Sequence, residues 1–96
     1  VDAFVDPTPS VVILAPVITS SLAASGTVGS AFSYQIAASG SPVSFNATGL
    51  PSGLSVNSQT GAITGTPTAD GDTTATISAV NSGGTGSASL VISIAP

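Results

Sequence analysis

Asp70 and Asp72 are the residues of this chain whose type and spacing could do chemistry. A carboxylate pair can serve a glycosidase, or it can give oxygen ligands to calcium, which takes about six to eight of them. A glycosidase would also need a cleft lined with aromatic side chains, and the aromatic residues here are few: Phe4, Phe32, Tyr34 and Phe45. Two aspartates in a turn are best explained as part of a solvated loop, in which their carboxylates accept hydrogen bonds from nearby backbone amides. Calcium is the alternative for this pair.

The composition argues against catalysis in general, because the chain has no His, Cys, Lys, Arg or Glu. General acid–base and nucleophilic mechanisms need a partner group that titrates near neutral pH. The absence of cysteine also removes disulfides and zinc–thiolate sites. We therefore predict that the chain is not an enzyme and holds no cofactor.

The charge composition excludes two classes of partner. Aspartates supply every side-chain charge, and the formal net charge is -4. Nucleic-acid affinity comes largely from Lys and Arg, which also attract proteins to anionic membranes. A membrane span needs about 18 apolar residues, and Pro16 interrupts the longest apolar run, Val11 to Ile18. We predict neither nucleic-acid binding nor membrane insertion.

The mean hydropathy of +0.58 is high for a soluble chain with 4% charged residues. A coat of glycans or burial of surface in an assembly would explain it, and both indicate an extracellular or cell-surface location. The sequence begins at Val1 without a basic, hydrophobic leader, as expected after signal-peptide removal, although a recombinant fragment would look the same.

Asn46-Ala47-Thr48 is an N-glycosylation sequon. Strand alternation that buries Phe45 directs the Asn46 side chain outward, where a glycan could be attached. Asn46 is therefore the predicted glycosylation site, in a host that makes N-glycans.

Alternation of apolar and polar residues from Val17 onward predicts strands and no helix. The side chains expected to face the core are Phe32, Tyr34, Ile36, Val43, Phe45, Leu54, Val56, Ala75, Ile77, Ala79, Ala88, Leu90, Ile92 and Ile94. Clusters of Gly, Pro, Asn and Asp separate these runs, as at turns. We predict an all-β, immunoglobulin-like antiparallel β-sandwich of about seven strands over residues 17–96, plus an extra N-terminal strand or arm.

Three segments occur in order: Gly49 to Asn57, Thr60 to Pro67, and Ala79 to Gly84. Together they resemble the putative-Ig family of bacterial and archaeal surface proteins, which is similar to cadherin-like domains of the dystroglycan type. The resemblance covers roughly residues 17–95. It implies an extracellular sandwich, often one of several in a string, and it implies no activity. The apolar N-terminal segment and the lack of basic residues depart from it.

Residues 1–16 form the predicted arm, in which Val11-Val12-Ile13-Leu14 is a continuous apolar run typical of a strand covered on both faces. The arm could extend the first strand of its own sandwich. It could instead leave its domain and add as a donor strand to the next subunit, which repeated head to tail builds a fibre. The donor-strand residues would be Val1, Ala3, Val5, Val11, Val12, Ile13 and Leu14.

These features lead to a prediction of a structural subunit of an extracellular filament, with copies of itself as partners and possible attached glycans. The alternative is an Ig-like spacer, or an adhesion or carbohydrate-binding module, of a larger cell-surface protein. Carbohydrate binding would need exposed aromatic residues, and alternation leaves only Phe4 as a candidate.

Overall fold

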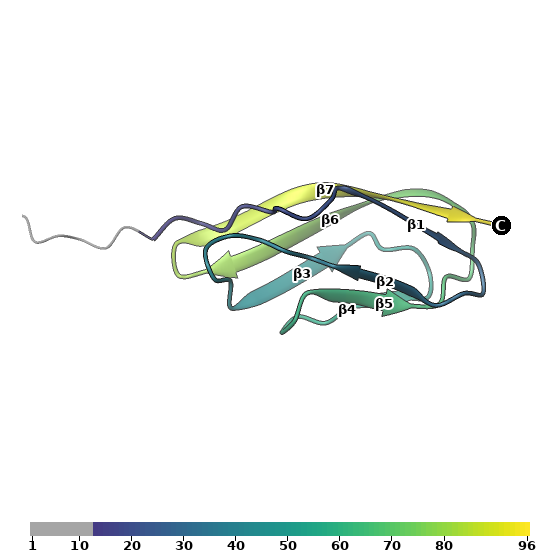
Figure 1. The fold of residues 1–96 in the computed structure, drawn as a ribbon, viewed down its shortest axis with the longest axis horizontal. Coiled ribbons are helices and arrows are strands. Elements are labelled where there is room, and N and C mark those ends of the chain that lie inside the picture. The colour runs from purple at the N-terminus through teal and green to yellow at the C-terminus, as the bar shows by residue number, and fades with distance from the viewer. Residues whose placement is uncertain (1–12) are drawn as a thin grey trace, which may run out of the picture.

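The computed structural model describes residues 13–96 as a two-layer β-sandwich (Figure 1). Its strands are β1 (Ala23–Thr27), β2 (Phe32–Gln35), β3 (Ser44–Thr48), β4 (Leu54–Val56), β5 (Ala62–Gly65), β6 (Gly71–Asn81) and β7 (Gly84–Ala95). The prediction of an all-β sandwich of about seven strands is confirmed. Within residues 13–96 there is no helix long and apolar enough to cross a membrane.

One sheet has four strands in the order β1-β7-β6-β3, and the other has three in the order β2-β5-β4. Neighbouring strands are antiparallel except for β1, which pairs with β7 in parallel. Residues 18–20, just before β1, lie instead beside the end of β2 in the other sheet, through a bridge between Ile18 and Ala38 and hydrogen bonds to Ala37 O. The chain then crosses to the four-stranded sheet. This crossing explains the one departure from the predicted antiparallel pairing.

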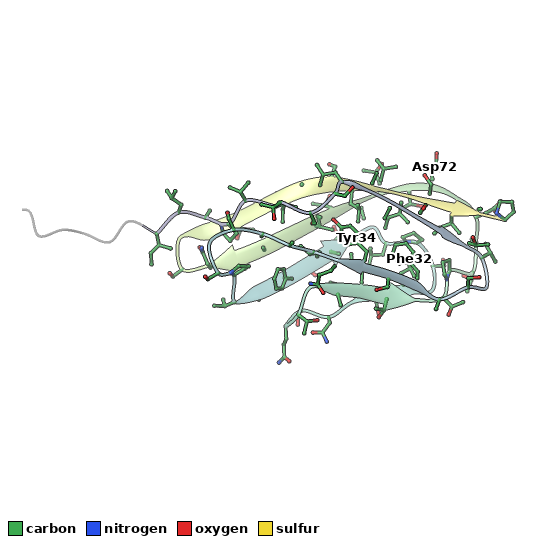
Figure 2. All side chains as sticks on the ribbon, in the orientation of Figure 1. Phe32, Tyr34 and Asp72 are labelled. Atoms are coloured by element: carbon green, nitrogen blue, oxygen red, sulfur yellow. The ribbon has the colours of Figure 1, made fainter. Side chains whose placement is uncertain are left out.

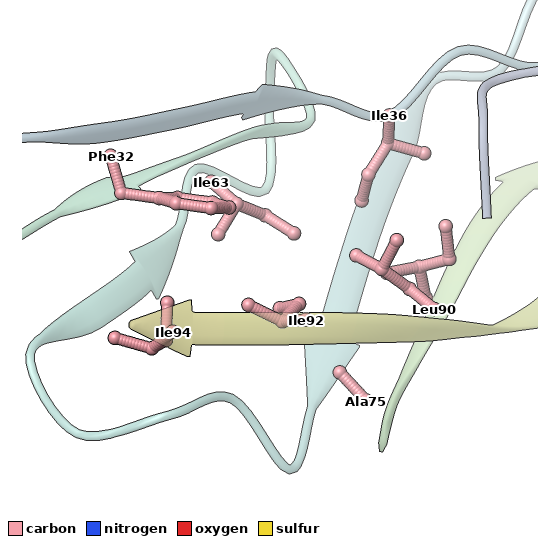
Figure 3. Packing of buried hydrophobic residues seen from close by; sticks show 8 residues of the cluster. Phe32, Ile36, Ile63, Ala75, Leu90, Ile92 and Ile94 are labelled. Carbon is pink, nitrogen blue, oxygen red and sulfur yellow. The ribbon is translucent and has the colours of Figure 1, made fainter. Parts of the chain in front are cut away.

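Apolar side chains from both sheets meet in the core (Figure 3). Its buried members are Phe32, Ile36, Ile63, Ala75, Ile77, Leu90, Ile92 and Ile94. On β6 and β7 they recur at every second position, because successive side chains of a strand point to opposite faces. Burial of each large aliphatic side chain contributes about 1.5–3 kcal/mol, so packing replaces the disulfides that the chain lacks.

Val43 is the one predicted core residue that the structure places outside, with 74% of its surface exposed. Ser41 adopts a φ of 50° and Pro42 follows it, so the ladder of β3 starts only at Ser44. The alternation rule does not apply before the ladder. Tyr34, labelled in Figure 2, is half-buried. Its ring packs against the core, and its hydroxyl lies 2.8 Å from Ser20 Oγ.

The chain enters the described fold at one end of the sandwich and leaves at the other (Figure 1). The N-terminal pole comprises residues 13–17, 39–43 and 80–84; the C-terminal pole comprises residues 28–30, 69–72 and 94–96. The twelve residues of β7 connect them. At about 3.3 Å per residue, a strand of this length separates the poles by roughly 36 Å.

Candidate functional site

Asn81 is the buried polar side chain of the described residues, and it holds the N-terminal pole together. Its Nδ2 donates to Leu14 O and to Gly40 O, at 2.9 Å each. Its Oδ1 accepts from the Gly83 amide at 2.7 Å. One amide group therefore fixes the entering chain, the 39–43 loop and the β6–β7 turn to one another.

The entering chain also packs closely on glycines of β7 and of the turn before it. Ile13 O lies where a Cβ on Gly83 would be, and Pro16 O lies where a Cβ on Gly86 would be. Val17 exchanges hydrogen bonds with Ser39, through Ser39 Oγ at 3.2 Å and the Ser39 amide at 2.9 Å. Backbone can approach backbone this closely because glycine has no side chain.

These contacts place part of the predicted donor strand on its own domain. Ile13 and Leu14 have their backbones bound in cis, while their side chains are exposed rather than covered on both faces. The other predicted donor residues lie outside the described residues: Val1, Ala3, Val5, Val11 and Val12. Donor-strand exchange stays a prediction for them.

Replacing Gly86 with alanine tests whether residues 13–17 dock in cis. Gly86 lies inside β7 with a φ that any residue adopts, so alanine brings no backbone strain. Its Cβ would displace Pro16 O, and we expect a loss of about 1–3 kcal/mol in the free energy of unfolding, measured by urea denaturation.

The matched experiment repeats Gly86→Ala in a chain that starts at Val17, compared with Gly86 in the same shortened chain. The penalty should vanish there, because the obstructing carbonyl is gone. An equal loss in both backgrounds would show that residues 13–16 do not cross Gly86.

The carboxylate pair lies at the C-terminal pole, where Figure 2 labels Asp72. Asp72 pairs with Ser93 of β7. Both aspartate side chains are exposed. No group of three or more acidic, His or Cys side chains gathers among residues 13–96. Two carboxylates offer at most four of the six or more oxygens that calcium takes, so Asp70 and Asp72 do not by themselves form a site.

The remaining predicted site features lie on the strands. Asn46 is exposed on β3, and its occupancy by a glycan stays a prediction. Phe32 is buried, Tyr34 and Phe45 are partly buried against the core, and Phe4 lies outside the described residues. Between residues 13 and 96, therefore, no aromatic ring is exposed as a platform for sugar stacking.

Local hydrogen bonds occupy backbone groups of both edge strands of the larger sheet. On β1, Ser21 Oγ lies 3.4 Å from Ala23 N and 3.2 Å from Ala23 O. On β3, the Phe45 amide donates to Ser58 O at 2.9 Å. A free strand edge is a template for pairing with another chain, so these bonds reduce the edge available for strand addition.

Comparison with known protein families gives a match that covers the whole sandwich. The family model described as "Putative Ig domain" matches residues 15–95. No curated protein matches the chain.

Solved structures give the same fold. A putative alpha-galactosidase from Bacteroides fragilis NCTC 9343 superposes with a TM-score of 0.79 at 35% identity, over 91% of this chain and 19% of that one. A second protein of that organism, a putative alpha-galactosidase/melibiase, gives 0.78 at 29% identity, over 86% and 18%. The titin M3 domain gives 0.62 at 18% identity, over 86% and 99%, which shows the fold alone. The chain thus spans under a fifth of the two bacterial proteins.

Proposed function

Because this chain belongs to the Putative Ig domain family, we propose that it is a non-catalytic spacer module of a larger extracellular protein. The observation that carries the proposal is the placement of the two poles. The described chain enters beside the β6–β7 turn and ends at the far end of β7 (Figure 1). Segments attached at the two ends would be held apart along the long axis of the sandwich, by roughly the length of β7.

The comparisons support a module over a filament subunit. In the two bacterial proteins, the matching region is less than a fifth of a longer chain. The local hydrogen bonds at Ala23 of β1 and Phe45 of β3 shorten the free edges of the larger sheet, which also favours a domain that does not polymerise by strand addition. The spacer interpretation therefore replaces the filament as the favoured one.

A spacer also accounts for the surface better than a carbohydrate-binding module does. Tyr34 and Phe45 pack against the core, so the described surface offers hydroxyl and amide groups but no exposed ring. Sugar-binding sites in proteins rely on concave pockets and aromatic contacts. The described residues form no pocket.

Sedimentation velocity of the 96-residue chain tests the proposal. A spacer should remain a monomer of 9.0 kDa from micromolar to millimolar concentration. A filament subunit would give fast-sedimenting polymers that appear as fibres in electron micrographs. Fibres from the undenatured chain would reject the spacer and restore the donor-strand hypothesis.

A further inference from the structure

The three asparagines of the chain differ in what their side chains do. Asn57 Oδ1 accepts from the Gln59 and Thr60 amides, at 2.8 and 3.2 Å. Asn81 bonds three backbone groups at the N-terminal pole. Within the described part of the chain, no hydrogen bond engages the side chain of Asn46. Asn46 is thus the asparagine whose amide can be modified without breaking a bond that holds the fold.

Asn46 also has the neighbour that N-glycosylation requires. The acceptor motif is an asparagine with Ser or Thr two positions later. Thr48 fills that position for Asn46. Neither Asn57 nor Asn81 has a hydroxyl residue at the corresponding place. The motif, which depends on sequence, and the unengaged amide, which depends on structure, therefore identify the same asparagine.

Strand β3 holds this acceptor outward. Phe45 and Ala47 pack against the core, so the alternate residues Asn46 and Thr48 point away from it. Both are exposed. Because side chains two positions apart on a strand lie on one face, the Asn46 amide and the Thr48 hydroxyl are presented together. β3 is also the last strand of its sheet, with β6 on one side only.

The sheet around Asn46 leaves room for a sugar. Ser78 of β6 lies directly opposite Asn46 across the ladder. The other neighbours on this face are also short hydroxyl residues, and they are exposed: Thr76, Ser87 and Ser89. No described segment therefore covers this part of the face. A sugar attached to Asn46 would meet hydroxyl groups that can bond to it, and neither a bulky nor a charged side chain.

A glycan on this face would supply what the composition lacks. The only side-chain charges come from four aspartates, and the mean hydropathy is +0.58. A soluble domain usually carries about a quarter of charged residues to keep its surface hydrated. N-glycans are bulky and solubilising, so one glycan on the larger sheet would hydrate a broad area that has few charges of its own.

We propose that Asn46 carries an N-linked glycan. The donor is an oligosaccharide whose first sugar is bound through its anomeric carbon to a phosphate group. The bond from Asn46 Nδ2 to that carbon forms as the carbon–oxygen bond to the phosphate breaks. The phosphate leaves with the electron pair, and one Nδ2 proton passes to a base of the transferase. The proposal uses the extracellular location of the proposed spacer and goes beyond its spacing function.

The test is mass spectrometry of the chain purified from the cells that produce it. Trypsin cannot cut a chain without Lys or Arg, so a protease that cuts before aspartate is used, and it releases residues 6–69 as one fragment. The wild-type fragment should carry the added mass of a glycan, which tandem fragmentation should place on Asn46. The variants Asn46→Gln and Thr48→Val should each remove that mass, whereas Thr48→Ser should keep it.

Thr76→Val is the matched control, because Thr76 pairs with Thr48 across the ladder but lies outside the motif. This variant should keep the glycan, and its loss there would contradict recognition through Thr48. An unmodified wild-type fragment would overturn the proposal, as would added mass that survives Asn46→Gln, since that mass would lie on hydroxyl groups. An unmodified monomer would reject the glycan and leave the spacer function standing. Glycosylated fibres would reject the spacer function and leave the glycan standing.

Discussion

Replacing Gly53 with alanine is expected to lower the free energy of unfolding by more than about 3 kcal/mol. Gly53 has a φ of 94°, a conformation that side chains other than glycine rarely adopt. A Cβ on Gly53 would also overlap with Thr66 O, where the turn before β4 meets the end of β5. The next residue of one segment, Leu54, pairs with the preceding residue of the other, Gly65, so neither backbone can move aside without breaking the β4–β5 pairing.

Gly29→Ala is the matched control, because Gly29 has a φ of 83° but nothing lies within 4 Å of where its Cβ would be. That variant should lose only the left-handed strain of about 1–2 kcal/mol. Urea denaturation of the two variants separates strain from overlap. Equal losses would show that the contact between Gly53 and Thr66 does not matter for stability.

Asn81→Asp is expected to destabilise the domain by about 3–5 kcal/mol, as a buried charge without a partner does. The aspartate could still accept from the Gly83 amide. Its carboxylate, however, would replace the NH₂ group that donates to Leu14 O and Gly40 O, and would face two carbonyl oxygens. Asn81→Ala removes the hydrogen bonds without adding charge and should cost about 1–3 kcal/mol.

The pH dependence distinguishes the two Asn81 variants. Burial and the facing carbonyls raise the pKa of the introduced carboxyl above its ordinary value, so the native variant binds more protons than the unfolded chain between the two pKa values. Its stability should therefore rise relative to that of Asn81→Ala as the pH is lowered through the acidic range. Parallel pH curves for the two variants would contradict the proposed contacts of Asn81.

Alternation predicted the core well where long ladders exist. Ile77 and Ala79 of β6 pair with Ala88 and Gly86 of β7, and their inward direction follows directly from the sequence. The prediction that Val43 faces the core was wrong, because alternation holds only where a strand is paired. The positive φ of Ser41 bends the chain, and the pairing of β3 with β6 starts at Ser44, one residue after Val43. The positive φ of Ser41 cannot be recognised from the alternation of apolar and polar residues in the sequence.

The central role of Asn81 was not predicted. The cluster of Asn and Gly residues from Asn81 to Gly84 predicts a turn, and the structure has one there, since Asn81 pairs with Gly84 across a two-residue loop. Its side chain, however, bonds groups 67 and 41 residues away. The available signal was an asparagine that continues the buried alternation of Ile77 and Ala79, a position where a polar group needs partners.

The parallel pairing of β1 also lay beyond the sequence. Residues 23–27 alternate weakly, because they are Ala, Ser, Gly and Thr, and they carry no signal for a change of sheet. The close packing of β1 on β2 of the facing sheet is likewise visible only in three dimensions, where a Cβ on Gly26 would lie 2.8 Å from Phe32 Cδ1. Local composition identified a strand there but not its neighbour.

Whether residues 13–17 dock on their own domain or on another molecule distinguishes a self-contained module from a subunit that exchanges strands. Nuclear Overhauser effects in an equimolar mixture of ¹³C-labelled and ¹⁵N-labelled chains, filtered for contacts within and between molecules, measure it directly. The structure predicts contacts between Pro16 and Gly86 that arise only within one molecule. The same contacts between differently labelled molecules would contradict it and would identify the chain as a donor-strand subunit.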